Sequence, residues 1–336
     1  MGLLRRDLGT PQRLVTAAAS VAAVFPGQGS QRVGMGRELY DASAAAKAVL
    51  DAAERALPGL LDLMWEGPDT ALQLTQNQQP ALVAAGAAAY AAYLERGGRP
   101  AVIGAGHSLG EYTAHVAAGA LTVEDAVRLV RARGRYMQDA VPAGAGAMAA
   151  ILKLETDLIE ETLAMVMADV GSTGELVAIA NLNAPGQTVI SGTTAGVELA
   201  VERLKERGAR AVPLKVSAPF HCALMAPAAE KLSPDLHAAR FATGAFGIVS
   251  NVTARPVQSP EDAAGLLVQQ VTSPVRWVDC VRTMSVQADS GSGVRFIEFG
   301  SGEVLTNLAR RILQDADAVS VTDAATLEEV SDDTRA

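Results

Sequence analysis

Residues that often carry special chemistry are scarce in this chain of 336 residues, which has two cysteines and four histidines. The cysteines, Cys222 and Cys280, are too few for a disulfide framework and form no Cys-x-x-Cys motif. A reducing compartment is therefore expected. No set of residues with the spacing of metal ligands stands out, so no metal is expected either.

Basic residues are also few, and long apolar runs are missing. Lysine and arginine number 28 against 37 aspartates and glutamates, which leaves a net charge of −9. Nucleic-acid binding needs a basic footprint, so it is not the expected function, although a local basic patch is still allowed. The nearest approach to a membrane helix, residues 80–94, is mostly alanine and shorter than the about 20 residues required. The sequence predicts a cytoplasmic protein that binds neither nucleic acid nor membrane.

What the chain does have is apolar material for a large core. Hydrophobic residues make up 49% of it and charged residues 19%, a balance that argues against disorder. The length is typical of about two domains. Residues 1–19 carry three arginines before an alanine-rich stretch, but Asp7 and Pro11 interrupt the resemblance to a signal peptide. We therefore expect a flexible N-terminal extension and, as the alternative, a targeting segment.

Apolar strands alternate with helices over most of the chain. Strands are predicted at residues 20–25, 101–104 and 294–299. Helices are predicted at residues 39–56, 81–94, 111–120, 123–138 and 227–239, the last with a break at Pro234. This alternation favours an α/β fold with a parallel sheet covered by helices on both faces. We expect residues 326–336, rich in acidic residues and threonine, to be a loose tail.

A different order of predicted strands and helices interrupts this α/β alternation. Between residues 142 and 216 we predict the order strand, helix, strand, strand, helix, strand. The predicted strands are 147–154, 176–181, 187–191 and 210–216, and the predicted helices are 156–170 and 194–207. This order is the ferredoxin-like arrangement, so residues 142–216 are expected to form an inserted small subdomain. The catalytic core would then comprise residues 20–141 and 217–325.

The strongest local motif is Gly-His-Ser-Leu-Gly at residues 106–110. It has the Gly-x-Ser-x-Gly form of a nucleophile elbow, in which a serine lies on a sharp turn between a strand and a helix. Glycines flank the serine because a Cβ would clash in so tight a turn. Ser108 is therefore the candidate nucleophile, and the N–H of Leu109 a candidate oxyanion-hole donor.

A serine nucleophile needs a base, and only four histidines are available. His107 lies inside the elbow, His115 lies on the following helix, and His237 lies among helical residues. His221 follows the last predicted strand of the insertion, in a loop stiffened by Pro219. The sequence leaves two possibilities for His221: the general base, or a histidine packed in a loop.

Two further features are ambiguous when taken alone. Gly27 and Gly29 form a Gly-x-Gly turn after the first strand, but Arg32 stands where a dinucleotide fingerprint needs its third glycine. No Gly-Lys-Ser/Thr follows either, so no phosphate loop is expected. Arg133 lies on a helix between Arg131 and Arg135, and an inward-facing arginine there could bind a carboxylate bidentately. The spacing does not decide whether Arg133 or its two neighbours face inward.

Short motifs follow one another from about residue 20 to about residue 315. They are FPGQGSQ at 25–31, QQPA at 78–81, GHSLGEY at 106–112, RG at 133–134 with MQ at 137–138, GAMAA at 146–150, NLNAPGQTVISG at 181–192, SAPFHCALM at 217–225, NV at 251–252, residues 267–277, and FGSGEVL at 299–305. With these motifs the chain resembles the malonyl-CoA:acyl carrier protein transacylases of bacterial fatty-acid synthesis. It is similar as well to the acyltransferase domains of polyketide synthases.

The resemblance implies a role for each matching residue and a hydrolase-like core with a ferredoxin-like insertion. The implied roles are nucleophile for Ser108, base for His221, carboxylate binding for Arg133, oxyanion hole for Gln28 and Leu109, and lining of the active site for Gln79, Phe220 and Gln270. It also implies a serine–histidine dyad without an acidic third member. Phenylalanine at position 220 should crowd an α-methyl group, which favours malonyl over methylmalonyl.

The implied reaction is a ping-pong transfer of malonyl from malonyl-CoA to the phosphopantetheine thiol of an acyl carrier protein. Coenzyme A thioester enters as substrate, no cofactor is implied, and a monomer is expected. Two alternatives stay open: a trans-acting acyltransferase of a polyketide synthase, and a serine thioesterase or hydrolase.

The carrier is usually acidic, so docking on this acidic chain would need a basic patch. The candidates are Arg203, Lys205, Arg207, Arg210 and Lys215. The other interpretation is that these are ordinary solvated charges.

Overall fold

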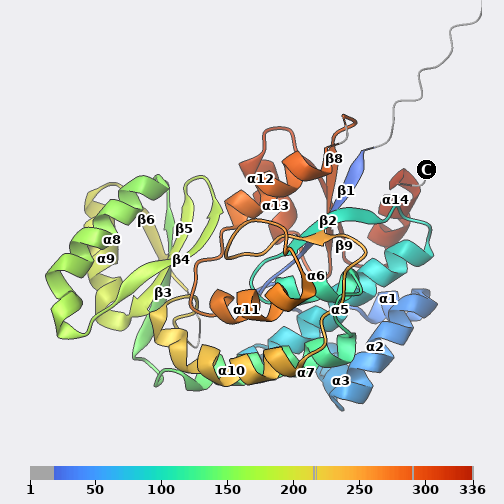
Figure 1. Cartoon of the computed structure of the whole chain (residues 1–336), viewed down its shortest axis with the longest axis horizontal. Helices are drawn as coiled ribbons and strands as arrows, with labels where there is room; N and C mark the ends of the chain where they lie inside the picture. The colour runs from blue at the N-terminus through green and yellow to red at the C-terminus, as the bar shows by residue number, and fades with distance from the viewer. Residues whose placement is uncertain (1–18, 215, 217, 290, 335–336) are drawn as a thin grey trace, which may run out of the picture.

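The chain folds around two separate β-sheets (Figure 1). The computed structural model describes residues 19–214, 216, 218–289 and 291–334, so residues 1–18 of the predicted extension and Lys215 of the basic cluster lie outside the described residues. Sheet A is parallel, with the strand order β7-β2-β1-β8-β9. Its strands are β1 (Ser20–Phe25), β2 (Ala101–Gly106), β7 (Gly247–Ile248), β8 (Val294–Phe299) and β9 (Asp317–Val321).

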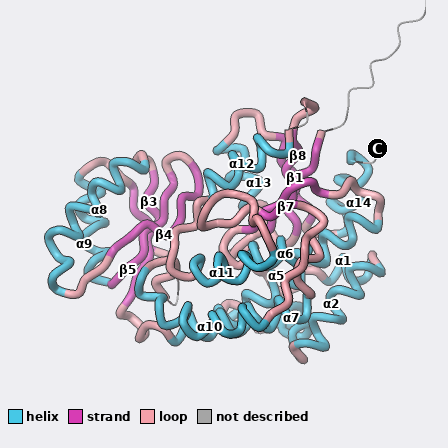
Figure 2. The backbone as a smooth tube through the Cα atoms, viewed as in Figure 1, coloured by secondary structure: helices cyan, strands magenta, loops and turns pink. Residues whose placement is uncertain are grey.

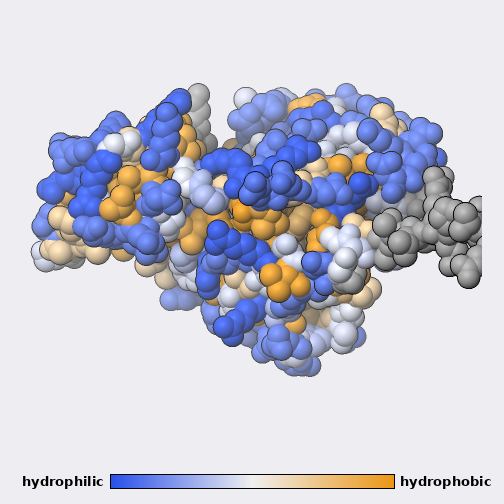
Figure 3. Space-filling view, turned by 90° about the horizontal axis from the view of Figure 1, so that it is seen from above, coloured by the Kyte–Doolittle hydropathy of each residue, from blue (hydrophilic) through white to orange (hydrophobic). Residues whose placement is uncertain are grey.

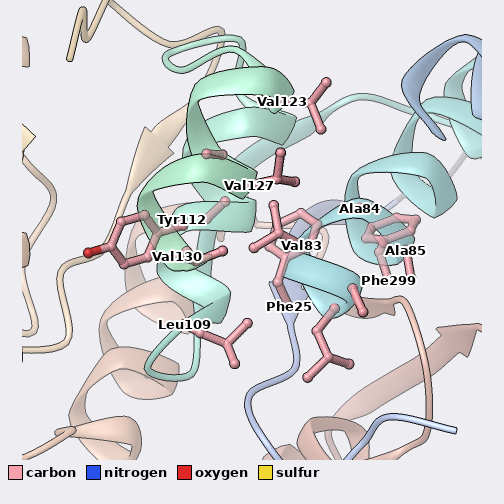
Figure 4. Close-up of a cluster of buried hydrophobic side chains, with 14 of the residues drawn as sticks. Phe25, Val83, Ala84, Ala85, Leu109, Tyr112, Val123, Val127, Val130 and Phe299 are labelled. Atoms are coloured by element: carbon pink, nitrogen blue, oxygen red, sulfur yellow. The ribbon is translucent and has the colours of Figure 1, made fainter. Parts of the chain in front are cut away.

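Sheet A is buried on both faces, as its continuous apolar strands require. Val21, Ala23 and Phe25 of β1 belong to a core cluster with the helices that follow β1 and β2, whereas Ala22 and Val24 belong to a second cluster on the opposite face. Figure 4 shows part of the first cluster, where Phe25 and Phe299 lie near Val83, Leu109 and Val130. Helices α12 (Trp277–Ala288) and α13 (Val304–Ile312) pack against the strands in this second cluster.

Most helices of the chain belong to the region around sheet A. Before the insertion they are α1 (Arg37–Ala42), α2 (Ala44–Ala56), α3 (Leu60–Glu66), α4 (Asp69–Leu72), α5 (Thr75–Glu95), α6 (Gly110–Ala117) and α7 (Val123–Asp139). After it they are the 3-10 turn η2 (Ala223–Met225), then α10 (Ala226–Ala238), α11 (Pro260–Gln270), α12 (Trp277–Ala288), α13 (Val304–Ile312) and α14 (Ala324–Thr334). No helix within the described residues is long and apolar enough to cross a membrane.

Sheet B is antiparallel, with the strand order β4-β5-β3-β6. In chain order, the strands of this sheet and the helices between them are β3 (Gly146–Leu152), α8 (Thr156–Val170), η1 (Gly171–Thr173), β4 (Val177–Ala184), β5 (Gln187–Thr193), α9 (Thr194–Glu206) and β6 (Arg210–Pro213). Both helices lie on its outer side (Figure 2). The ferredoxin-like order is confirmed, and so is the predicted fold class, a hydrolase-like α/β core with a ferredoxin-like insertion. The division into domains stays a prediction.

Strand β4 attaches sheet B to the rest of the chain. Leu182 N–H donates to the carbonyl of Val275 (2.9 Å), and Val275 N–H donates to the carbonyl of Ala180 (2.9 Å). These bonds attach sheet B to the segment before α12. In the space-filling view, apolar surface gathers where the two lobes meet (Figure 3).

Three local predictions are wrong. The helix expected at residues 39–56 is divided at Ser43, whose extended backbone and hydroxyl cap α2 by accepting from Ala46 N–H. Helix α10 continues past Pro234 without the expected break. The loose tail expected from residue 326 is instead most of α14, because Leu327 and Val330 are buried against the core.

Candidate active site

The Gly-x-Ser-x-Gly motif forms a sharp turn between β2 and α6. Ser108 has a φ of 53°, in the left-handed region. A Cβ on Gly106 would lie 1.8 Å from the carbonyl of Gly110, and one on Gly110 would lie 2.2 Å from the carbonyl of Phe25. Both glycines are therefore required by close backbone approach, and they place Ser108 at the carboxyl end of the central strands.

Ser108 and His221 are in hydrogen-bonding contact. Ser108 Oγ lies 2.8 Å from His221 Nε2, and His221 Nδ1 lies 2.9 Å from the carbonyl oxygen of Gln270. Because a carbonyl only accepts, Nδ1 carries the proton and Nε2 is left to accept from the serine. Burial, and then the positive charge of Arg133, lowers the pKa of His221 to about 3. The imidazole is thus neutral, the state that a general base requires.

The loop that carries His221 is tightly held. His221 has a φ of 61°, again in the left-handed region. The Pro219 ring packs against Gly146 of β3, where a Cβ would lie 2.3 Å from it. Cys222 Sγ donates to the carbonyl of Pro219 (3.2 Å). Sheet B therefore helps to position the histidine.

Arg133 is the inward-facing arginine of its helix, and it is fully buried. Nη1 donates to Gln79 Oε1 (2.8 Å), and Nη2 donates to Gln270 Oε1 (3.0 Å) and Ser108 Oγ (3.1 Å). Neither amide oxygen carries a charge, and no carboxylate among the described residues forms an ion pair with this guanidinium. Burial lowers the pKa of Arg133. A buried cation held by neutral acceptors is suited to an anionic ligand.

The predicted oxyanion-hole residues belong to two segments that come together at the elbow. Leu109 follows Ser108 directly, and Gln28 follows Gly27, whose Cα approaches the elbow so closely that a Cβ would lie 2.7 Å from the carbonyl of His107. Within the described residues, the backbone N–H groups of Gln28 and Leu109 donate to no protein acceptor. The Gln28 side chain is engaged elsewhere, since its amide donates to Gln78 Oε1 (2.6 Å).

A cavity of about 660 Å³ opens onto the serine between the two sheets. Its core-side lining includes Gln28, Gln78 and Ser108, and its sheet-B side includes Met148, Asn181 and Leu214. Phe220 and His221 line it as well, whereas Arg133, Gln79 and Gln270 are buried behind it. No group of histidine, cysteine or acidic side chains within the described part of the chain could hold a metal ion.

Among the described residues, His221 is the histidine that hydrogen-bonds to Ser108 Oγ, and the other three have different surroundings. His107 Nε2 lies 2.8 Å from Asn183 Oδ1, and its ring lies beside that of Trp277. His115 is buried against Phe241 with both ring nitrogens unbonded, and burial lowers its pKa to about 4. His237 is exposed.

Two buried residues were missed by the sequence reasoning, although both lie in quoted motifs. Asn251 Oδ1 accepts from Ser108 N–H (2.7 Å), and Asn251 Nδ2 donates to the carbonyl of Gly106 (2.8 Å). Glu111 Oε2 accepts from Asn251 N–H (3.0 Å) and from Gln270 Nε2 (2.7 Å). Glu111 is the one acidic or basic residue, histidine aside, in the helix that follows the nucleophile, and this was the signal that could have identified it.

Comparison with known families agrees with this geometry. The family described as "Acyl transferase domain" matches residues 23–332. Fold and site therefore define an acyltransferase.

The particular family follows from individual relatives. The malonyl CoA-acyl carrier protein transacylase of Bacillus subtilis is 46% identical over 312 residues, which cover 92% of this chain and 96% of that protein. The one of Escherichia coli is 42% identical, over 87% and 92% of the two chains. A crystal structure of an acyl carrier protein S-malonyltransferase from Vibrio cholerae superposes with a TM-score of 0.87 at 42% identity, covering 93% of this chain and all of that one.

A malonyl-transacylase solved in complex with a type II PKS acyl-carrier protein is similar too, with a TM-score of 0.87 and 40% identity over 94% and 99% of the two chains. The chain belongs to the malonyl CoA-acyl carrier protein transacylase family of enzymes.

Proposed function

We propose that this enzyme transfers a malonyl group from malonyl-CoA to the phosphopantetheine thiol of an acyl carrier protein through a malonyl-Ser108 intermediate. The observation that carries the proposal is the position of Ser108 Oγ. It lies 2.8 Å from a neutral imidazole and 3.1 Å from a buried guanidinium that has no carboxylate partner among the described residues. Nucleophile, base and anion site are thus within contact of one another.

In the first half-reaction, Ser108 Oγ attacks the thioester carbonyl while His221 Nε2 accepts its proton. The unbonded N–H groups of Gln28 and Leu109 would stabilise the oxyanion, and one such donor is worth about 3–4 kcal/mol. As the tetrahedral intermediate collapses, the C–S bond breaks and His221 returns the proton to the sulfur of coenzyme A.

In the second half-reaction, the thiol of the carrier gives its proton to His221 and attacks the malonyl ester. The C–O bond to Ser108 breaks, and His221 protonates the serine oxygen. The enzyme returns to its starting state, so the mechanism is ping-pong.

Arg133 would bind the free carboxylate of the malonyl group and so select the substrate. An acetyl group would leave the buried cation without a partner, and losing one partner of a buried pair costs about 3–5 kcal/mol. A bound carboxylate would also weaken the influence of Arg133 on His221, which would raise the pKa of the base toward its ordinary value.

The carrier and the pathway belong to the proposal as well. Fatty-acid synthesis is the expected setting because the curated relatives are named as malonyl CoA-acyl carrier protein transacylases. A polyketide carrier would use the same chemistry. Cytoplasmic location, a monomeric state and independence of a cofactor stay predictions.

The test is the intact mass of the enzyme after brief incubation with malonyl-CoA, followed by addition of carrier protein. A malonyl adduct on wild type that moves to the carrier, and no adduct on Ser108→Ala, is expected. Loss of the adduct without any carrier would instead identify a hydrolase. Absence of an adduct together with absence of free coenzyme A would contradict malonyl-CoA as the donor.

A further inference from the structure

One buried carboxylate beside the site has no part in the chemistry described above. Glu111 is fully buried one residue into α6, three positions after the nucleophile. Its Oε2 accepts two hydrogen bonds from segments 140 and 159 residues away: the backbone N–H of Asn251 (3.0 Å) and the side-chain amide of Gln270 (2.7 Å). These contacts join α6, α11 and the loop that contains Asn251 at one carboxylate oxygen.

The first of these partners fixes the elbow. Asn251 accepts from Ser108 N–H and donates to the carbonyl of Gly106, so one side chain spans the turn that carries the nucleophile. Glu111 holds the backbone of that asparagine. The position of Ser108 Oγ therefore depends on Glu111 through a single intermediate residue.

The second partner fixes the base and the cation. The Nε2 of Gln270 donates to Glu111 and to the carbonyl of Ser108 (3.0 Å), and its Oε1 accepts from Arg133. Arginine only donates and Glu111 Oε2 accepts, so the amide between them has one favourable orientation. The backbone carbonyl of the same glutamine orients His221.

The amide between Glu111 and Arg133 has a further consequence. A carboxylate in direct contact with the guanidinium would compete with an anionic substrate. With the neutral Gln270 interposed, Arg133 is held in place and its charge remains available. We propose that Glu111 is a positioning residue that keeps Ser108, His221 and Arg133 in register through Asn251 and Gln270. This inference rests on the proposed function.

The test is a graded series at position 111 with a matched control. Both hydrogen bonds end on one oxygen, so Glu111→Gln can keep them, Glu111→Asp retracts the acceptor by one methylene, and Glu111→Met removes it at similar length. Glu298 is the control: it is a buried carboxylate that accepts from Thr306 N–H (2.8 Å), and in the described part of the chain no hydrogen bond joins it to the site residues. Glu298→Met thus reports the cost of removing a buried acceptor elsewhere.

The readouts are the single-turnover rate of malonyl-enzyme formation, the malonyl-to-acetyl ratio and the thermal midpoint. Glu111→Gln is expected within about fivefold of the wild-type rate, Glu111→Asp about tenfold slower and Glu111→Met at least about 100-fold slower with a reduced malonyl-to-acetyl ratio. Glu298→Met should lower the midpoint while the rate per folded molecule and the ratio stay unchanged.

Three results would overturn the inference: a folded Glu111→Met enzyme with the wild-type rate and ratio, a Glu111→Gln enzyme as slow as Glu111→Met, or additive losses from Glu111→Met and Gln270→Met. Contacting residues that act as one unit should be non-additive. If Glu111→Met does not fold, wild-type kinetics in Glu111→Asp would overturn it. Failure of the proposed function would be distinguishable, because wild type itself would then form no malonyl adduct or would lose the adduct before any carrier is added.

Discussion

The two sheets of this molecule bury different kinds of side chain. The region around parallel sheet A buries Ser108, Glu111, Arg133, His221 and Gln270. The core of antiparallel sheet B is a separate cluster of aliphatic side chains, and none of the buried residues described between 146 and 213 is charged. Parallel strands end at one edge, where loops from distant segments converge, and there buried polar groups can satisfy one another.

The difference shows that the candidate reacting groups lie around sheet A, whereas sheet B has a supporting role. Sheet B contributes a wall of the cavity and the β3 surface against which the histidine loop packs, but no reacting group. Its substitutions should therefore alter stability, whereas substitutions around sheet A should alter chemistry and selectivity.

The largest effect is expected from Arg133→Ala. Removing the buried cation should slow malonyl transfer to Ser108 by about 100- to 1,000-fold, because the substrate carboxylate loses its partner. Acetyl transfer should rise, since an uncharged acyl group no longer faces an unpaired cation. Rates of acyl-enzyme formation from both donors measure this. Arg131→Ala, on the same helix but bonded to Asn77 and Gln76, is the control. Unchanged malonyl selectivity would remove Arg133 from the site.

The second-largest effect is expected from a substitution in the core of sheet B. Ile190 of β5 is fully buried between Ala149 and Ile179 on the neighbouring strands. Ile190→Ala should reduce the free energy of unfolding by about 2–5 kcal/mol through lost contacts and a cavity. Denaturant unfolding measures the loss. The malonyl-to-acetyl ratio of the folded enzyme should not change, and a shift in that ratio would break the proposed separation of roles.

A smaller, pH-dependent effect is expected at His115. Burial lowers the pKa of His115 to about 4. As the pH falls below about 6.5, the unfolded chain therefore binds a proton at this histidine while the folded chain does not. The stability linked to this neutral state is present above pH 6.5 and is lost as pH falls toward 4.

His115→Leu should therefore raise the thermal midpoint, by more at pH 5 than at pH 8, with a gain of about 2 kcal/mol at pH 5. The exposed His237→Leu variant is the control for loss of a histidine at the surface. A gain at position 115 that did not depend on pH would contradict the expectation.

The smallest effect is expected at the basic cluster on the insertion. Arg207 pairs with Glu161 (3.0 Å) and Arg203 with Asp169 (3.6 Å), so acidic residues of α8 offset two of these charges. Charge reversal of Arg207 and Arg210 should change the rate of transfer to the carrier by less than about threefold at low salt. A steep, salt-sensitive loss would instead make this cluster part of the docking surface.

Much of this architecture could be predicted from local sequence patterns. β1 and β8 have the predicted bounds, and α8 runs over the predicted residues 156–170. The C-terminal elements α13, β9 and α14 were not predicted. Strand β9 pairs with β8, and the two helices bury side chains in the two core clusters, contacts that local pattern does not contain. The buried state of Arg133 and the contacts of Glu111 were equally beyond local pattern, since they depend on segments more than 50 residues away.

The backbone at Ser108 and His221 has a thermodynamic consequence. Both are non-glycine residues in the left-handed region, a conformation that costs of order 1–3 kcal/mol each. Glycine would adopt either conformation with less strain. At these two positions a replacement that relaxes the chain would also remove the chemistry, unlike at Lys153, Ala254 and Asp315, which have a positive φ as well. Selection for thermal resistance alone would therefore favour an inert descendant, and continued turnover is what keeps the strained residues in place.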